Sequence, residues 1–168
     1  MSDQVLFENK YDFDDKLLKA YVKTITKGSR ISALFITVVS AIFSVMEYKN
    51  NSKTFSIILA GIAVIGLLIF ILAIPKTLKQ VRNQRNILSK KIIQITFNHM
   101  NVFENGNERK IKFGEIVAIL QDNENMYLML DKTEGIVINK SGFTKGTFEE
   151  FKNFIDKKFV RQQPMSGG

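Results

Sequence analysis

Two apolar runs, ISALFITVVSAIFSVM at residues 31–46 and FSIILAGIAVIGLLIFILAI at residues 55–74, decide the fold of this 168-residue chain. Neither run contains a charged side chain. As a helix, the second run is about 30 Å long, which matches the hydrocarbon core of a bilayer. The first run reaches about 24 Å, and it extends backwards if Lys27 and Arg30 direct their charges to the headgroups. The sequence therefore predicts a transmembrane hairpin of two retained helices.

The distribution of basic side chains predicts the orientation of this hairpin. The turn between the runs carries only Lys49 and Lys53. Basic residues near the ends of membrane helices collect on the cytoplasmic side. We therefore expect a multi-pass protein with two membrane helices and with both termini in the cytoplasm. The basic residues that flank the outer ends of the two runs are Lys19, Lys23, Lys27, Arg30, Lys76, Lys79, Arg82 and Arg85.

Composition excludes several function classes. The net charge is +8, but residues 47–91 hold eight basic residues against one acidic, whereas residues 92–168 hold ten of each. A nucleic-acid-binding domain would carry the basic excess itself, so we expect no nucleic-acid partner. No acidic or basic residue lies deep within either run, which argues against a transporter.

The chain also lacks the residue patterns of enzymes and metalloproteins. There is no cysteine, and the single histidine, His99, lies between two expected strands, where a turn or surface position is the default. No serine or carboxylate stands at a motif spacing from it, and no phosphate loop or dinucleotide fingerprint occurs. We therefore predict no catalytic, cofactor-binding or metal-binding residues, no cofactor, and no enzymatic activity.

A face of small and hydroxylated side chains runs along the first apolar helix. Such side chains let two helix backbones approach closely in lipid. The simpler interpretation is packing against the second helix within the hairpin, and the alternative is the interface of a homo-oligomer. The residues of this helix-packing face are Ser29, Ala33, Thr37, Ala41 and Ser44, and Ser40 lies on nearly the same face.

Residues 75–91 form a basic connector without any acidic residue. Pro75 suits the first turn of a new helix, so we predict a juxtamembrane helix over this segment. One interpretation is a solvated helix face that also sets the orientation of the hairpin. The other is a contact with anionic membrane lipids, worth about 1 kcal/mol for each basic residue near the surface. The residues of this expected lipid contact are Lys76, Lys79, Arg82, Arg85, Lys90 and Lys91.

Residues 92–160 change to the alternating pattern of half-buried strands. We expect a meander of short antiparallel strands, with a two-residue hairpin turn at Asn105-Gly106, closed by a helix that Thr147 and Glu150 cap. The expected strands cover residues 93–97, 100–103, 110–113, 116–120, 126–130 and 136–138. We predict that residues 161–168 are a disordered tail.

Residues 1–30 predict a cytoplasmic strand and helix that lead into the first apolar run. Val5, Phe7 and Tyr11 indicate a strand, and Asp14 can cap the helix that follows. Because both ends of the chain lie on one side of the membrane, we expect this strand to join the C-terminal sheet. The fold class is thus an α+β membrane protein, with a two-helix hairpin and a small antiparallel β-domain closed by a C-terminal helix.

The order of parts and four segments of the β-domain carry a resemblance to a known family. The segments are Phe113-Gly114-Glu115-Ile116, residues 125–130 (NMYLML), residues 138–143 (INKSGF) and residues 147–151 (TFEEF). With its N-terminal strand and helix, hairpin, basic connector and β-domain, nearly the whole chain resembles the YcxB-like proteins of Gram-positive bacteria. Asn139 stands where the family commonly has proline. The resemblance implies a bacterial cytoplasmic membrane protein whose C-terminal domain is similar to pleckstrin-homology (PH-like) domains, with seven strands and one helix. It implies no activity, because its motifs are structural.

Two functional hypotheses follow from these observations. In the first, the chain is a membrane-anchored interaction module whose β-domain binds a protein partner or a lipid headgroup at the inner membrane surface. In the second, it is a self-protection protein that gives immunity to a bacteriocin or secreted toxin, and the hairpin itself blocks the attacker. The two hypotheses differ in whether the β-domain or the hairpin is essential.

Overall fold

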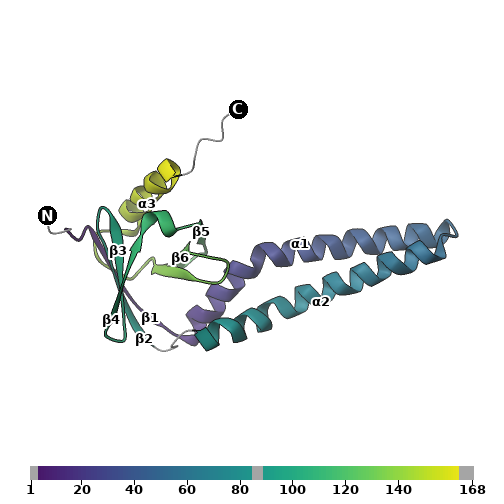
Figure 1. Cartoon of the computed structure of the whole chain (residues 1–168), viewed down its shortest axis with the longest axis horizontal. Coiled ribbons are helices and arrows are strands. Elements are labelled where there is room, and N and C mark those ends of the chain that lie inside the picture. Colours follow the sequence, from purple (N-terminus) through teal and green to yellow (C-terminus); the bar gives the residue numbers. More distant parts are fainter. Residues whose placement is uncertain (1–3, 85–88, 163–168) are drawn as a thin grey trace. The chain divides into compact units, whose positions relative to one another are not determined.

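The computed structural model describes residues 4–84 and 89–162, and it is an α+β structure with three helices and two antiparallel sheets. The chain divides into two compact units, of which one is Met1–Tyr21 with Arg85–Gly168 and the other is Val22–Gln84. We call the described part of the first unit the β-domain and the second unit the hairpin (Figure 1). The predicted disordered tail falls almost entirely outside the described residues, since only the end of the last helix reaches it.

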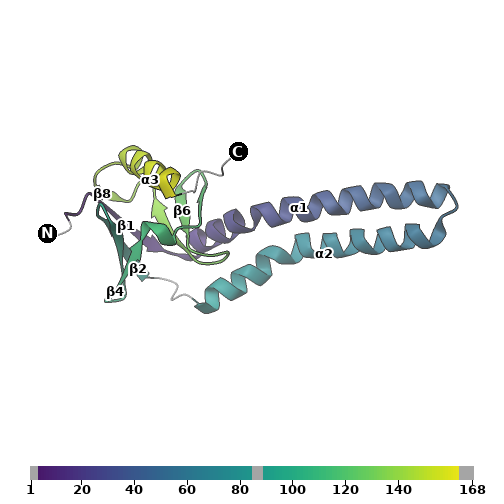
Figure 2. The ribbon, with the colours of Figure 1, turned by 45° about the horizontal axis from the view of Figure 1, so that its top comes forward.

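The hairpin is built from two long helices, α1 (Asp15–Lys49) and α2 (Lys53–Gln84), which lie side by side and antiparallel (Figure 2). They are joined by a tight turn in which Asn51 has a φ of 62°, a left-handed conformation that asparagine tolerates. Both helices are long and apolar enough to cross a membrane. The prediction of two long apolar helices is thus confirmed.

The expected separate juxtamembrane helix is wrong in its boundaries. Pro75 lies inside α2, which continues unbroken to Gln84, and strand β2 (Ser89–Ile95) already includes Lys90 and Lys91. A proline removes one helical hydrogen bond, but a helix in lipid tolerates this when local adjustments satisfy the freed carbonyl. The basic connector is therefore partly the end of α2 and partly the start of a strand.

The hairpin exposes its large apolar side chains. Of the large hydrophobic residues that are exposed in the described part of the chain, all except Phe97 and Val117 lie in the hairpin. Phe35 and Ile57, for example, are 69% and 72% exposed. The surface of this unit is therefore apolar on nearly every side.

The contact between α1 and α2, which we call the seam, is made mostly by small and hydroxylated residues, with Leu59 and Phe70 as its larger members. Ser44 Oγ donates to the Ser56 carbonyl (2.9 Å), and Ser56 Oγ donates back to the Ser44 carbonyl (2.8 Å). The alternating spacing of four and three residues is the repeat that keeps two helices in contact along a left-handed seam. The buried or half-buried residues of the seam are Ala33, Thr37, Ser40, Ser44, Ser56, Leu59, Ala63, Gly66 and Phe70.

The β-domain contains two sheets. The five-stranded sheet has the order β4-β3-β2-β1-β8, and the three-stranded sheet has the order β5-β6-β7. Every pairing is antiparallel. The strands not yet bounded are β1 (Phe7–Phe13), β3 (His99–Glu104), β4 (Asn107–Lys112), β5 (Ala118–Gln121), β6 (Asn125–Met129), β7 (Gly135–Asn139) and β8 (Phe143–Lys145).

The N-terminal strand joins the C-terminal sheet, as expected. Strand β1 pairs along its whole length with β2, from Phe7 opposite Ile95 to Phe13 opposite Ser89. These neighbouring strands stand on either side of the hairpin in the sequence, so the hairpin is an insertion between two paired strands. The β-domain therefore assembles only when segments about 80 residues apart meet.

Local signals in the sequence set the turns and helix ends correctly. Asp14 Oδ1 accepts a hydrogen bond from the Leu17 amide (2.7 Å) and caps α1. Glu150 and Thr147 exchange the two bonds of a capping box at the start of helix α3 (Phe148–Gln162). Asn105 and Gly106 have φ values of 49° and 80°, which is the two-residue turn expected between β3 and β4.

Three expectations about the strands are corrected by the structure. The described residues hold eight strands, one more than expected. The additional strand is β8, which pairs with β1 through only two register pairs. His99 is not at the surface: it starts β3 and is 4% exposed, with Nδ1 3.2 Å from the Thr96 hydroxyl. Phe97 lies outside β2, in the turn before His99, and is 60% exposed.

The core of the β-domain joins both sheets to α3. Phe151 and Ile155 on α3 are buried in one cluster with Ile93 from the first sheet and Leu128 from the second. Phe7 of β1 packs on the ring of Phe151 at 5.8 Å between centroids. The amphipathic C-terminal helix therefore closes the domain, as its apolar face predicts.

Candidate functional site

The residues predicted to contact anionic lipid are not a single cluster. Lys76, Lys79 and Arg82 are exposed on the last turns of α2. Arg85 lies outside the described residues. Lys90 and Lys91 belong to β2 in the β-domain, so the six residues are divided between the two units.

The side chain of Lys91 is paired with other residues of the β-domain. Its Nζ atom lies 3.0 Å from Glu104 Oε1 and 4.8 Å from the centre of the Phe13 ring, and the residue is 6% exposed. A buried ammonium is retained where a carboxylate pairs with it, as here. The charge of Lys91 therefore helps to join β2 to β3, whereas the neighbouring Lys90 is exposed to solvent.

A shallow hollow of about 280 Å³ lies along the β1–β2 ladder. Strand register places Tyr11 opposite Lys91 and Asp12 opposite Lys90, so charges of both signs line it. Three lysines and one aspartate line the hollow, but Lys10 pairs with Glu8 and Lys91 pairs with Glu104, so carboxylates outside the lining offset most of the positive charge. The residues that line the hollow are Lys10, Tyr11, Asp12, Lys90, Lys91 and Ile92.

The hairpin brings a second group of basic residues to the level of Lys76 and Lys79. Arg30 of α1 places its guanidinium carbon 4.6 Å from the centre of the Phe70 ring on α2, a cation–π contact. From this contact, α1 runs back toward Lys27 while α2 runs on toward Lys76, because the helices are antiparallel. The sequence placed all of these charges at one end of the hairpin, but it did not show the contact of Arg30 with Phe70.

The predicted helix-packing face is partly at the seam. Ala33 is buried, and Thr37 and Ser44 are half-buried, whereas Ser29 and Ala41 are exposed. A four-residue spacing turns by about 40° at each step around a helix, so its outer members rotate away from the partner. Ser40, which follows the 3.5-residue repeat of the seam, is buried in their place.

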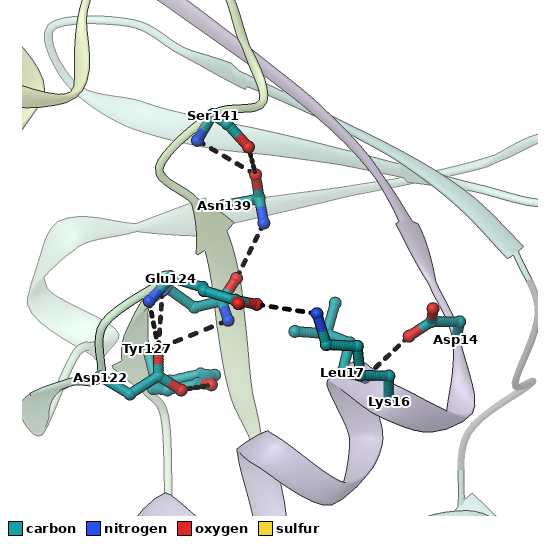
Figure 3. A network of polar contacts seen from close by, with 9 residues as sticks. Asp14, Lys16, Leu17, Asp122, Glu124, Tyr127, Asn139 and Ser141 are labelled. Carbon is teal, nitrogen blue, oxygen red and sulfur yellow. Dashed lines mark hydrogen bonds and ion pairs between the residues drawn. The ribbon is translucent and has the colours of Figure 1, made fainter.

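A network of polar side chains connects β1, β6 and β7 in the β-domain. Figure 3 shows the part of this network that includes Asp122, Tyr127, Asn139 and Ser141. Asn9, which is fully buried, donates from Nδ2 to the Asn139 carbonyl (2.7 Å) and accepts from the Asn139 amide (3.1 Å). Asn139 Nδ2 donates to Asn125 Oδ1 (3.0 Å), and Ser141 donates to Asn139 Oδ1 (2.7 Å). Each partner in this chain of amides comes from the protein itself, so the network fastens the N-terminal strand to the second sheet.

Asp122 ends the same network. Burial raises the pKa of its carboxyl group, but hydrogen bonds from the Tyr127 hydroxyl and from the Asn125 and Glu124 amides outweigh burial and hold the pKa below its ordinary value. A carboxylate that stays ionised and accepts several hydrogen bonds is a structural acceptor. It is a poor general acid, because it holds no proton near neutral pH.

The carboxyl group of Glu8 has a strongly lowered pKa. Hydrogen bonds from the side chains of Lys10, Thr144 and Gln94 lower the pKa of Glu8 to about 2 from an ordinary value of 4.5. Gln94 is on β2 and Thr144 is on β8, so Glu8 connects the two strands that flank β1.

No group of three or more His, Cys, Asp or Glu that could hold a metal ion occurs in residues 4–84 and 89–162.

The fold and these sites define a class of protein: an α+β chain in which a β-domain carries an inserted pair of long apolar helices. The family model described as YcxB-like protein matches residues 98–155, from the turn before β3 into α3. This match confirms the family resemblance over that part of the β-domain. No curated protein and no solved structure matches the chain.

Proposed function

We propose that this chain is an integral protein of the bacterial cytoplasmic membrane, anchored by the hairpin, with the β-domain on the cytoplasmic side. The observation that carries the proposal is the inverted burial of the hairpin, which has small and hydroxylated residues inside and large apolar residues outside. In water this surface would cost about 25 cal/mol for each Å² of apolar area. In lipid the same surface costs nothing, and a close-packed small-residue seam is how membrane helices associate.

The orientation in the proposal rests on charge. Lys27, Arg30, Lys76 and Lys79 lie at the end of the hairpin that joins the β-domain, whereas the turn is flanked by Lys49, Lys53 and the acidic Glu47. The greater number of basic residues therefore marks the cytoplasmic side.

The β-domain acts in this proposal as a non-enzymatic interaction module with a PH-like arrangement of two sheets and a closing helix. Its charge is balanced over residues 92–168, so it has no general attraction to anionic headgroups, and this favours a protein partner. Phe97 is its one exposed aromatic side chain among the described residues, held by Lys158 at 3.6 Å from the ring centre. Aromatic side chains are enriched at the centres of protein interfaces, where a few such residues carry most of the binding energy.

Because the chain has no cysteine, single-cysteine labelling tests the anchor and its orientation directly. Asn50→Cys lies in the turn, and Glu108→Cys lies on the exposed edge strand β4. In intact cells a membrane-impermeant maleimide should label only the Asn50→Cys variant, and after permeabilisation it should label both. Labelling of Glu108→Cys in intact cells would reverse the orientation, and release of the protein by alkaline carbonate would overturn the anchor.

Photo-crosslinking of the full chain in its membrane tests the module. A photoreactive residue at Phe97 should crosslink to a discrete protein, and one at the exposed Lys132 should not. Crosslinks that form only from a hairpin position such as Ile62 would contradict the module and favour the self-protection hypothesis.

A further inference from the structure

The two apolar runs of the hairpin are level at one end and uneven at the other. The reciprocal bonds of Ser44 with Ser56 and the contact of Arg30 with Phe70 set the antiparallel register. At the turn, the runs therefore end together, at Met46 and Phe55. At the basic end, the run on α2 continues to Ile74, four residues or about 6 Å beyond Phe70, whereas the run on α1 stops beside Arg30.

Arg30 therefore lies beside apolar helix surface. Its Nε atom is buried and has no hydrogen-bond partner among the described residues, and its guanidinium lies over the Phe70 ring. Glu47 is the only acidic residue between residues 16 and 84, and it stands at the opposite end of the hairpin. Within residues 4–84 and 89–162, the protein thus supplies an aromatic face but no carboxylate for this charge.

An unpaired guanidinium at this depth needs an anion. With the turn end at one boundary of a hydrocarbon core about 30 Å thick, the α2 run fills the core and Arg30 falls about 6 Å inside the other boundary. Charges at such positions draw water or headgroups inward, at a cost that an anion offsets. The planar guanidinium matches a phosphate group, to which it can donate two parallel hydrogen bonds.

Two exposed lysines flank the basic end of the hairpin, where the run on α1 stops before the run on α2. Lys27 is one turn before Arg30 on α1, and Lys76 is two residues beyond the end of the α2 run. We propose that Arg30, flanked by Lys27 and Lys76, binds the phosphate of an anionic phospholipid from the cytoplasmic leaflet, which fills the space left by the shorter run of α1. The inference rests on the proposed membrane anchor, and it identifies a lipid ligand for the hairpin.

Native mass spectrometry of the full-length protein, extracted from vesicles that contain phosphatidylglycerol and phosphatidylcholine, tests this site. The wild type should retain phosphatidylglycerol in preference to phosphatidylcholine. Arg30→Gln should reduce that retention about tenfold, the loss expected for one charge-assisted pair. Arg30→Lys should fall between the two, because an ammonium keeps the charge without the planar fork. Lys49→Gln, which removes a basic residue at the turn end, is the matched control and should retain lipid like the wild type.

The outcomes separate this inference from the anchor. All variants are first shown to resist carbonate extraction, and failure of the wild type at that step would overturn the proposed function. If inserted Arg30→Gln retains as much phosphatidylglycerol as the wild type, or if Lys49→Gln loses as much, the site is overturned and the anchor stands. Equal retention of both lipids would overturn the preference for an anionic lipid, and displacement by inorganic phosphate would show a site for the free ion instead.

Discussion

The hairpin and the β-domain sort the same amino acids in opposite ways. In the β-domain, Ile93, Leu128 and Phe151 are buried, and charged side chains cover the edge strand β4. In the hairpin, Phe35 and Ile57 are exposed, and mostly serine, threonine, alanine and glycine fill the contact between the helices. This inverted burial is what an apolar solvent favours, and it is the basis of the proposed membrane anchor, whereas burial in the β-domain follows the ordinary hydrophobic effect in water.

Truncating a buried phenylalanine in the β-domain should cost far more stability than truncating an exposed phenylalanine in the hairpin. Phe151→Ala removes a fully buried ring from the core cluster that joins both sheets to α3, so it should lower the free energy of unfolding of the β-domain by about 3–5 kcal/mol. The matched variant Phe43→Ala removes a ring on α1 that is 49% exposed and that faces lipid in the proposed anchor, and it should change hairpin stability by less than about 1 kcal/mol.

Amide hydrogen exchange of the full chain in detergent measures both effects, because it reports on β6 and α1 separately. A large loss of protection in α1 after Phe43→Ala would contradict the assignment of that face to lipid.

The seam should be sensitive to side-chain size at one glycine and insensitive at another. A Cβ atom at Gly66 would lie 2.5 Å from Thr37 Oγ1 and 3.2 Å from the Ala33 carbonyl oxygen, whereas a Cβ at Gly61 would meet nothing within 4 Å. Gly66→Leu should therefore separate the helices locally and cost about 1–3 kcal/mol. Gly61→Leu is the control and should cost nothing.

Oxidative crosslinking of a Ser44→Cys, Ser56→Cys pair reports on this contact, since the two hydroxyls lie 3.2 Å apart. Gly66→Leu should slow crosslinking within one chain. Equal rates for the two leucine variants would mean that the seam is not formed through Gly66. Crosslinks between chains would support the homo-oligomer interpretation instead.

The smallest expected effect is the acid sensitivity of the β-domain. The pKa of Glu8 is about 2 in the folded protein and is lowered from 4.5, so its carboxylate stabilises the fold above pH 4.5. This contribution is lost as the pH falls from 4.5 toward 2. Because the Glu8 side chain is partly solvated, we expect about 1 kcal/mol. Glu8→Gln should remove this part of the pH dependence, and thermal unfolding measured from pH 5 to pH 2 should show it.

An unchanged pH profile for Glu8→Gln would contradict the role of Glu8 in joining β1 to β2 and β8. Glu149→Gln is the control, because that carboxylate is exposed on α3. It should leave the profile as it is in the wild type.

Sequence patterns could not predict where several residues of the candidate sites lie in the structure. The basic residues that flank the apolar runs can be counted in the sequence, but the sequence predicts a helix at Lys90 and Lys91 because no local signal marks the start of β2 at Ser89. Burial of His99 depends on the turn that brings Thr96 to its ring. The pairing of Arg30 with Phe70 depends on the register of α1 against α2, which residues far apart in the sequence set together.

The sequence by itself determined the features that depend on near neighbours. These are the two apolar runs, the cap at Asp14, the capping box at Thr147, the turn at Asn105-Gly106 and the amphipathic last helix. Each follows from side chains within a few residues of one another, because periodicity and hydrogen bonding to the local backbone select the conformation.

Only the tertiary structure decided the features that join distant segments. It placed β1 beside β2 across the inserted hairpin, made Asn9 a partner of Asn139, and put Ser40 rather than Ala41 into the seam. These outcomes depend on register and on the rotation of one helix against another. A shift of one residue along a strand exchanges the faces of every side chain, and the residues of a single segment do not fix that choice.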